Sequence, residues 1–167
     1  MRKIRFVLMV ALSFCSISTV VADDKASFKD LHGVGIVLEP LSPEVETAGL
    51  RQTDIQTDVE LKLRLAGIPV LSRDEWTRTS GAPILYVNVS VFLSTTPDTW
   101  AFNIEADLSQ DVKLVRSPAI IVPNATTWRT FITGFAGHLV AVDYIRDSVK
   151  DQVDKFINAY LTMNPKQ

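Results

Sequence analysis

Two neighbouring stretches alternate strictly between apolar and polar residues, and the second reverses the parity of the first. Between residues 84 and 93 the aliphatic side chains occupy odd positions: Leu85, Val87, Val89, Val91 and Leu93. Between residues 100 and 114 the apolar side chains occupy even positions: Trp100, Phe102, Ile104, Ala106, Leu108, Val112 and Leu114. A period of two is typical of strands with one buried face. Odd positions of one strand and even positions of the next share a face only if the loop between them has an even number of residues. The sequence therefore predicts a hairpin with the four-residue turn Thr95–Asp98, which sets Leu93 opposite Trp100.

The region before this hairpin predicts a strand, a helix and a second strand. Leu31–Leu41 is apolar on both faces, which is typical of a buried strand. Glu44–Ala66 changes to a helical period, with an apolar stripe followed by Gly67 as a left-handed cap. Ile68–Leu71 is expected to be a short strand. The two strands should lie parallel in one sheet, because a strand, helix and strand in this order form a right-handed crossover.

The region after the hairpin predicts one more strand, Ala125–Phe135, and a long final helix over residues 137–163. The apolar stripe of that helix repeats at steps of three and four residues: Val142, Ile145, Val149, Val153, Phe156 and Tyr160. We therefore expect an α+β fold in two layers, a mixed, mainly antiparallel sheet of four to five strands with two helices on one face, in the order β-α-β-β-β-β-α. This order is similar to that of small periplasmic domains in envelope-assembly and transport-accessory proteins.

The N-terminus indicates where the protein works. Three basic residues come first, the apolar run Phe6–Val21 follows, and a small residue, Ala22, precedes Asp23. This arrangement predicts a bacterial signal peptide over residues 1–22, because the run is shorter than the ~20 residues that span a bilayer. A membrane anchor and a lipoprotein modified at Cys15 are the weaker alternatives. We expect a flexible lead-in over residues 23–30, a single domain over residues 31–163, and a periplasmic or secreted location.

Composition after this cleavage excludes several classes of protein. The signal peptide carries three of the 17 basic residues and none of the 19 acidic ones, so its removal changes the formal net charge from −2 to −5. An acidic domain without a basic run has no electrostatic reason to bind nucleic acid. The only cysteine, Cys15, leaves with the peptide, which excludes a disulfide, a thiol nucleophile and a thiolate metal site. No later stretch is long and apolar enough to cross a membrane.

Few residues suggest chemistry. His32 and His138 are the only histidines, and neither belongs to a spaced ligand motif, so both are interpreted as solvated or hydrogen-bonded side chains. Glu105, Asp107 and Asp111 project from one strand face, where two carboxylates could serve as acid and base in glycoside hydrolysis or hold calcium. We favour the simpler interpretation that these three carboxylates are solvated. The sequence therefore assigns no catalytic, cofactor-binding or metal-ligating residue, and no cofactor.

One apolar segment remains unexplained by the pattern of the strands. Residues 117–123 place four apolar residues between two prolines, after the alternation has stopped. The segment is either a short piece packed against the sheet or an exposed loop that meets a partner or a membrane surface. The candidate contacts with a protein or envelope component are Pro118, Ile120, Ile121, Val122 and Pro123. We expect a non-catalytic binding or accessory module of the cell envelope, and the alternative is a small hydrolase that uses the outward carboxylates.

Overall fold

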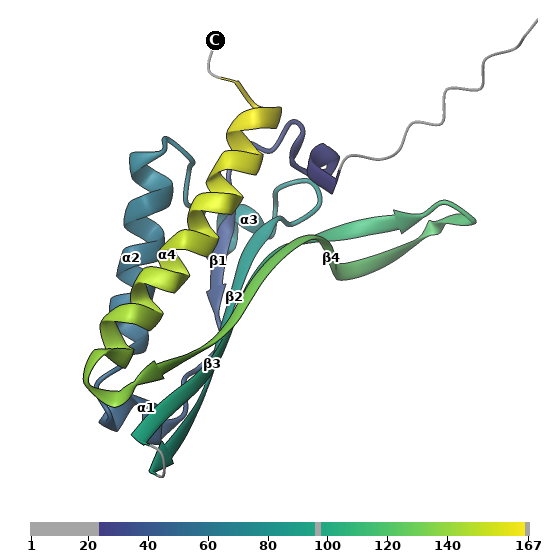
Figure 1. Ribbon diagram of the computed structural model, residues 1–167. Coiled ribbons are helices and arrows are strands. Elements are labelled where there is room, and N and C mark those ends of the chain that lie inside the picture. The colour runs from purple at the N-terminus through teal and green to yellow at the C-terminus, as the bar shows by residue number, and fades with distance from the viewer. Residues whose placement is uncertain (1–23, 96–97, 166–167) are drawn as a thin grey trace, which may run out of the picture.

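A four-stranded mixed sheet carries two long helices on one of its faces (Figure 1). The computed structural model describes residues 24–95 and 98–165, so the predicted signal peptide and Cys15 lie outside the described residues. The elements in chain order are η1 Asp24–Phe28, β1 Gly35–Leu38, α1 Pro43–Thr47, α2 Gln52–Leu65, α3 Arg73–Trp76, β2 Ile84–Thr95, β3 Asp98–Leu114, β4 Ser117–Gly137 and α4 His138–Met163. The predicted α+β class and two-layer arrangement are confirmed.

The strands follow one another across the sheet in chain order. β1 runs parallel to β2, whereas β2–β3 and β3–β4 are antiparallel. The parity argument gives the correct register for the central hairpin, since Leu93 lies opposite Trp100 and Thr95 opposite Asp98. Residues 96 and 97 of the predicted turn lie outside the described residues.

The first half of the chain differs from the prediction in three places. The strand expected over Leu31–Leu41 is the shorter β1. The helix expected over Glu44–Ala66 is divided into α1 and α2, because Gly49 adopts a φ of 108°, which a helix does not allow. The strand expected over Ile68–Leu71 is reduced to a single parallel bridge between Val34 and Val70. The parallel neighbour of β1 is therefore β2, and the sheet has four strands.

The core lies between the sheet and the layer formed by α2 and α4. The inward side chains of β2 and β3 are those of the predicted alternation, and Leu85, Ile104 and Leu108 are fully buried. α4 has the predicted range, and five of its six stripe residues are buried against the sheet: Ile145, Val149, Val153, Phe156 and Tyr160. The hydrophobic effect of burying this stripe holds α4 against one face of the sheet. The opposite face of the sheet remains open.

The segment expected to be a flexible lead-in places one side chain, that of Phe28, in the core. It begins with η1, and the ring of Phe28 is fully buried. That ring makes edge-to-face contacts with Trp128 and Phe156, at centroid distances of 5.3 and 5.1 Å. The backbone carbonyl of Phe28 also accepts a hydrogen bond from Nδ2 of Asn164 at 2.7 Å. An aromatic ring buried between β4 and α4 therefore anchors a segment whose polar composition suggested a loose connection.

Candidate functional site on the open face of the sheet

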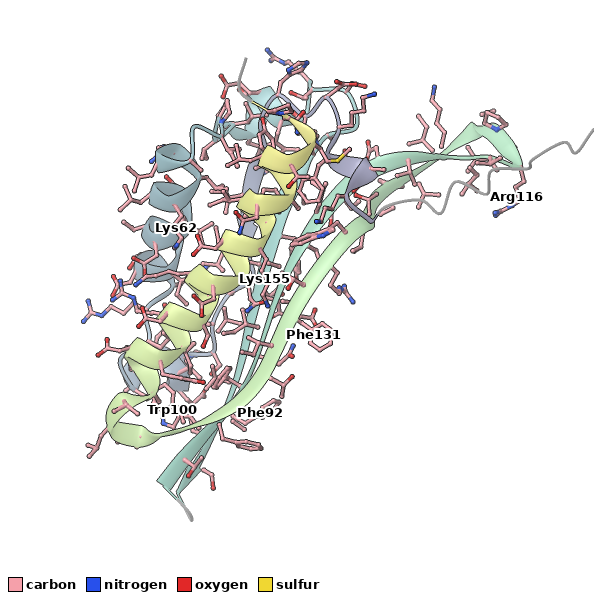
Figure 2. All side chains as sticks on the ribbon, turned by 45° about the horizontal axis from the view of Figure 1, so that its top comes forward. Lys62, Phe92, Trp100, Arg116, Phe131 and Lys155 are labelled. Atoms are coloured by element: carbon pink, nitrogen blue, oxygen red, sulfur yellow. The ribbon has the colours of Figure 1, made fainter. Side chains whose placement is uncertain are left out.

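The open face of the sheet is organised as rows of side chains that cross β2, β3 and β4. The first row is Phe92, Ala101 and Phe135, and the second is Ser90, Asn103 and Thr133. The third is Asn88, Glu105 and Phe131, and the fourth is Tyr86, Asp107 and Arg129. Figure 2 shows Phe92 and Phe131 projecting from this face and Trp100 on the side of the helices. The face therefore changes along its length from exposed phenyl groups to a charged and aromatic end.

A pocket of about 730 Å³ lies at the charged end, between the sheet and α3. Its apolar lining is Ile36, Val37, Leu71, Trp76, Ile84 and Tyr86, and its polar lining is Arg73, Asp107, Ser109, Asn124, Thr126 and Arg129. α3 reaches this face because Gly35 leaves room for the indole of Trp76. A Cβ atom at Gly35 would lie 2.3 Å from Cδ1 of Trp76, so any other residue there would displace the ring.

The polar floor of the pocket is an ion pair in which only Asp107 is buried. Nη2 of Arg129 lies 2.6 Å from Oδ2 of Asp107, and Nε lies 2.9 Å from Oδ1. Oγ1 of Thr126 donates a further hydrogen bond to Oδ2 at 3.3 Å. The Asp107 side chain is 3% exposed, whereas that of Arg129 is 50% exposed. The pKa of Arg129 is raised mainly by its hydrogen bonds to Asp107. The negative charge of the Asp107 carboxylate raises this pKa further.

This ion pair corrects the interpretation of Asp107 as a solvated carboxylate. Both of its oxygens accept charge-assisted hydrogen bonds, so Asp107 is fixed in place rather than free to act as a base. Arg129 lines the pocket, and its Nη1 has no hydrogen-bond partner among the described residues. The arrangement presents one positive group, held at a fixed position, to a ligand.

A second polar contact lies beside the pocket, on β2. The hydroxyl of Tyr86 donates a hydrogen bond of 2.7 Å to Oε2 of Glu39, which follows β1. This hydrogen bond, with a smaller contribution from burial, raises the pKa of Tyr86 to about 12. Tyr86 therefore stays protonated at neutral pH and presents a neutral aromatic surface to the pocket.

The other residues that the sequence singled out lie apart from the pocket. Glu105 accepts a hydrogen bond from Nδ2 of Asn103 at 3.2 Å. Asp111 accepts a hydrogen bond from the backbone N–H of Asn124 at 3.1 Å, so it holds the start of the β3–β4 extension. Within residues 24–95 and 98–165, no group of three His, Cys, Asp or Glu side chains has the arrangement of a metal site.

The two histidines have different surroundings. His138 accepts a hydrogen bond from the indole N–H of the buried Trp100 through Nδ1, at 3.2 Å, and the two rings are in edge contact. This contact agrees with the interpretation of His138 as a hydrogen-bonded side chain. His32 is exposed and lies before β1. Neither histidine lines the pocket on the open face.

The apolar segment between the two prolines lies on an extension of β3 and β4 that projects from the body of the protein (Figure 1). Pro118, Ile120, Ile121 and Pro123 are exposed, and Val122 is partly buried. The structure therefore brings these five candidate contacts together on one projection, separate from the pocket. It does not pack them into the core.

Comparisons with known proteins identify no relative. No protein-family model matches the chain, and neither the curated proteins nor the solved structures contain a significant match. Among the described residues, no helix is both long and apolar enough to cross a membrane.

Sequence reasoning missed the two residues that define the pocket most clearly, Trp76 and Arg129. A signal for Arg129 was present, because Arg129, Phe131, Thr133 and Phe135 share one parity and so one face of β4. An arginine in a row with exposed phenylalanines marks a face that is not ordinary solvated surface. Trp76 gave no comparable signal, since its position depends on the space above Gly35.

Proposed function

We propose that this protein is a non-catalytic binding module of the bacterial cell envelope, periplasmic or secreted, that holds a small ligand in the pocket on the open face. The ligand class that fits has a flat apolar part and an anionic group. Trp76 and Tyr86 offer aromatic surface, and Arg129 and Arg73 offer positive charge. The volume of about 730 Å³ lies in the range of about 300–1,000 Å³ that is usual for small-molecule sites.

The single observation that carries the proposal is the excess of positive charge in the pocket of an acidic chain. The charged lining residues are two arginines and one aspartate, and that aspartate is already bonded to Arg129. Arg73 is exposed on α3. Two guanidinium groups beside aromatic rings form a site for an aromatic anion, because guanidinium binds carboxylate and phosphate groups in a fixed geometry.

The hydrolase alternative is the weaker proposal. Glycoside hydrolysis needs two carboxyl groups that act as acid and base, with room for substrate between them. Asp107 has both oxygens bonded to Arg129, and Glu105 is bonded to Asn103 outside the pocket lining. Neither carboxylate is therefore placed to exchange a proton with a substrate in the pocket.

A fluorescent anion tests the proposal directly. Anilinonaphthalene sulfonate combines flat aromatic rings with one sulfonate, and its emission rises in an apolar site. We expect one saturable site in the wild-type protein, and binding that is about tenfold weaker or more in Trp76→Ala and in Arg73→Gln, equivalent to about 1.4 kcal/mol or more. Phe92→Ala is the matched control, because Phe92 is exposed on the same face outside the pocket. It should leave the affinity unchanged.

Two results would contradict the proposal. Binding that is lost in Phe92→Ala but kept in Trp76→Ala would move the site to the phenyl end of the face. Turnover of a nitrophenyl glycoside or ester by the wild type, abolished in Glu105→Gln with an unchanged melting temperature, would establish the hydrolase instead.

A further inference from the structure

The projecting part of the β3–β4 hairpin lies outside the hydrophobic core. We define the arm as residues 112–123, from Val112 to Pro123. No residue of the arm is buried, and Val115 at its turn is 98% exposed. Figure 2 shows Arg116 at the far end of the arm, distant from both helices. The arm therefore lies outside the core, and Val115, Ile120 and Ile121 are exposed to solvent.

The composition of the arm is that of a surface that meets lipid. Its aliphatic residues are Val112, Leu114, Val115, Ala119, Ile120, Ile121 and Val122. Its only charged residues, Lys113 and Arg116, are both positive, although the whole chain carries a net charge of −2. Two effects attract such a surface to a bilayer. Its exposed aliphatic groups are buried in the lipid, and its cations are attracted by the negative charge of the headgroups.

The backbone of the arm argues against the addition of another strand. The register shifts between Lys113 and Leu114, and residues 118–120 have no partner on β3. Pro118 and Pro123 also lack the N–H groups that a neighbouring strand would need. These features disfavour a second copy of the chain or a protein partner relative to a lipid surface.

We propose that the arm is a membrane-binding element that buries its exposed aliphatic side chains in the interface of an anionic bilayer, with Lys113 and Arg116 at the level of the headgroups. This inference is independent of the pocket on the open face. It goes beyond the proposed ligand binding because it gives the module a surface on which to act.

Vesicle flotation tests the charge requirement. Wild-type protein should bind vesicles of phosphatidylcholine with about one-third phosphatidylglycerol, and bind pure phosphatidylcholine far more weakly. Lys113→Glu with Arg116→Glu should weaken binding to the anionic vesicles about tenfold or more, since each cation near such a surface contributes about fivefold. Arg51→Glu with Arg78→Glu is the matched control, because these exposed cations lie outside the arm and the change in net charge is the same. The melting temperature should stay unchanged in both variants.

A fluorescent label tests the insertion. An environment-sensitive fluorophore on Val115→Cys, in a Cys15→Ser background, should shift to shorter wavelength when anionic vesicles are added. The same label on Leu139→Cys should not shift, because Leu139 is 96% exposed at the start of α4, far from the arm (Figure 1). All variants share one N-terminus, so any contribution of the first 23 residues cancels.

Three results would overturn the inference. The first is a wild-type protein that does not bind the anionic vesicles. The second is equal weakening by the arm variant and its control. The third is a concentration-dependent dimer that Val115→Asp with Ile121→Asp abolishes, without vesicle binding, which would assign the arm to a second copy of the chain.

Discussion

We expect the removal of Arg129 to lower the free energy of unfolding more than the removal of Asp107. Arg129→Met removes the guanidinium and leaves a carboxylate that is 3% exposed without its main partner. Breaking a buried pair in this way typically destabilises by about 3–5 kcal/mol. The Thr126 hydroxyl still bonds Asp107, and the open pocket admits water, so we expect the lower end of this range, about 3 kcal/mol.

Asp107→Asn should have a smaller effect. Arg129 is 50% exposed, so its charge is hydrated when the carboxylate is removed, and the asparagine oxygen still accepts a hydrogen bond. A loss of about 1 kcal/mol is expected, the usual net contribution of one hydrogen bond. Glu105→Gln on the same strand face is the control, with a change within about 0.5 kcal/mol.

Thermal melts followed by circular dichroism measure the difference. For a domain of this size, 1 kcal/mol shifts the melting temperature by about 2–4 °C. Arg129→Met should therefore lower it by roughly 6–12 °C and Asp107→Asn by roughly 2–4 °C. Equal losses in the two variants, or a larger loss in Asp107→Asn, would refute the reasoning from unequal burial.

Three further predictions concern the pocket wall and the core. The pKa of Tyr86 is raised to about 12, so its contribution to stability is full below pH 10 and is lost as the pH rises through 12. Glu39→Ala should lower the pKa of Tyr86. A tyrosinate absorbance titration, compared with that of Tyr86→Phe, would detect the change. Val149→Asp should destabilise by several kcal/mol because Val149 is buried, whereas Leu139→Asp should change the unfolding free energy by less than about 0.5 kcal/mol. Phe28→Ala should cost about 3–5 kcal/mol in denaturant unfolding, and a cost below about 1 kcal/mol would mean that η1 is not part of the core.

The parts of the fold that the sequence predicted correctly are those that one local pattern determines. The register of β2 and β3 follows from their alternation and a short turn, and α4 follows from a single apolar stripe. The division between α1 and α2 at Gly49 was missed because the helical period continues on both sides of it. The burial of Phe28 was missed because its partners, Trp128 and Phe156, lie 100 or more residues later in the chain.

The ion pair could not be predicted, because it depends on irregular pairing between β3 and β4. Continued without a shift from the Leu114–Ser117 pair, the hairpin would set Asn124 opposite Asp107. Three register shifts along these strands bring Arg129 there instead, and onto the same face. Bulges of this kind leave little signature in a single sequence, so the pairing of Arg129 with Asp107 was not accessible from it.

The most direct test of the ligand site uses the three tryptophans of the chain as separate reporters. Trp76 lines the pocket, whereas Trp100 and Trp128 are buried on the helix side of the sheet. Their indole N–H signals can be resolved by nuclear magnetic resonance and assigned with single Trp→Phe variants. Titration with anilinonaphthalene sulfonate should shift the Trp76 signal in a saturable way and leave the other two in place. An unmoved Trp76 signal, or equal shifts of all three, would contradict a ligand site between α3 and the open face of the sheet.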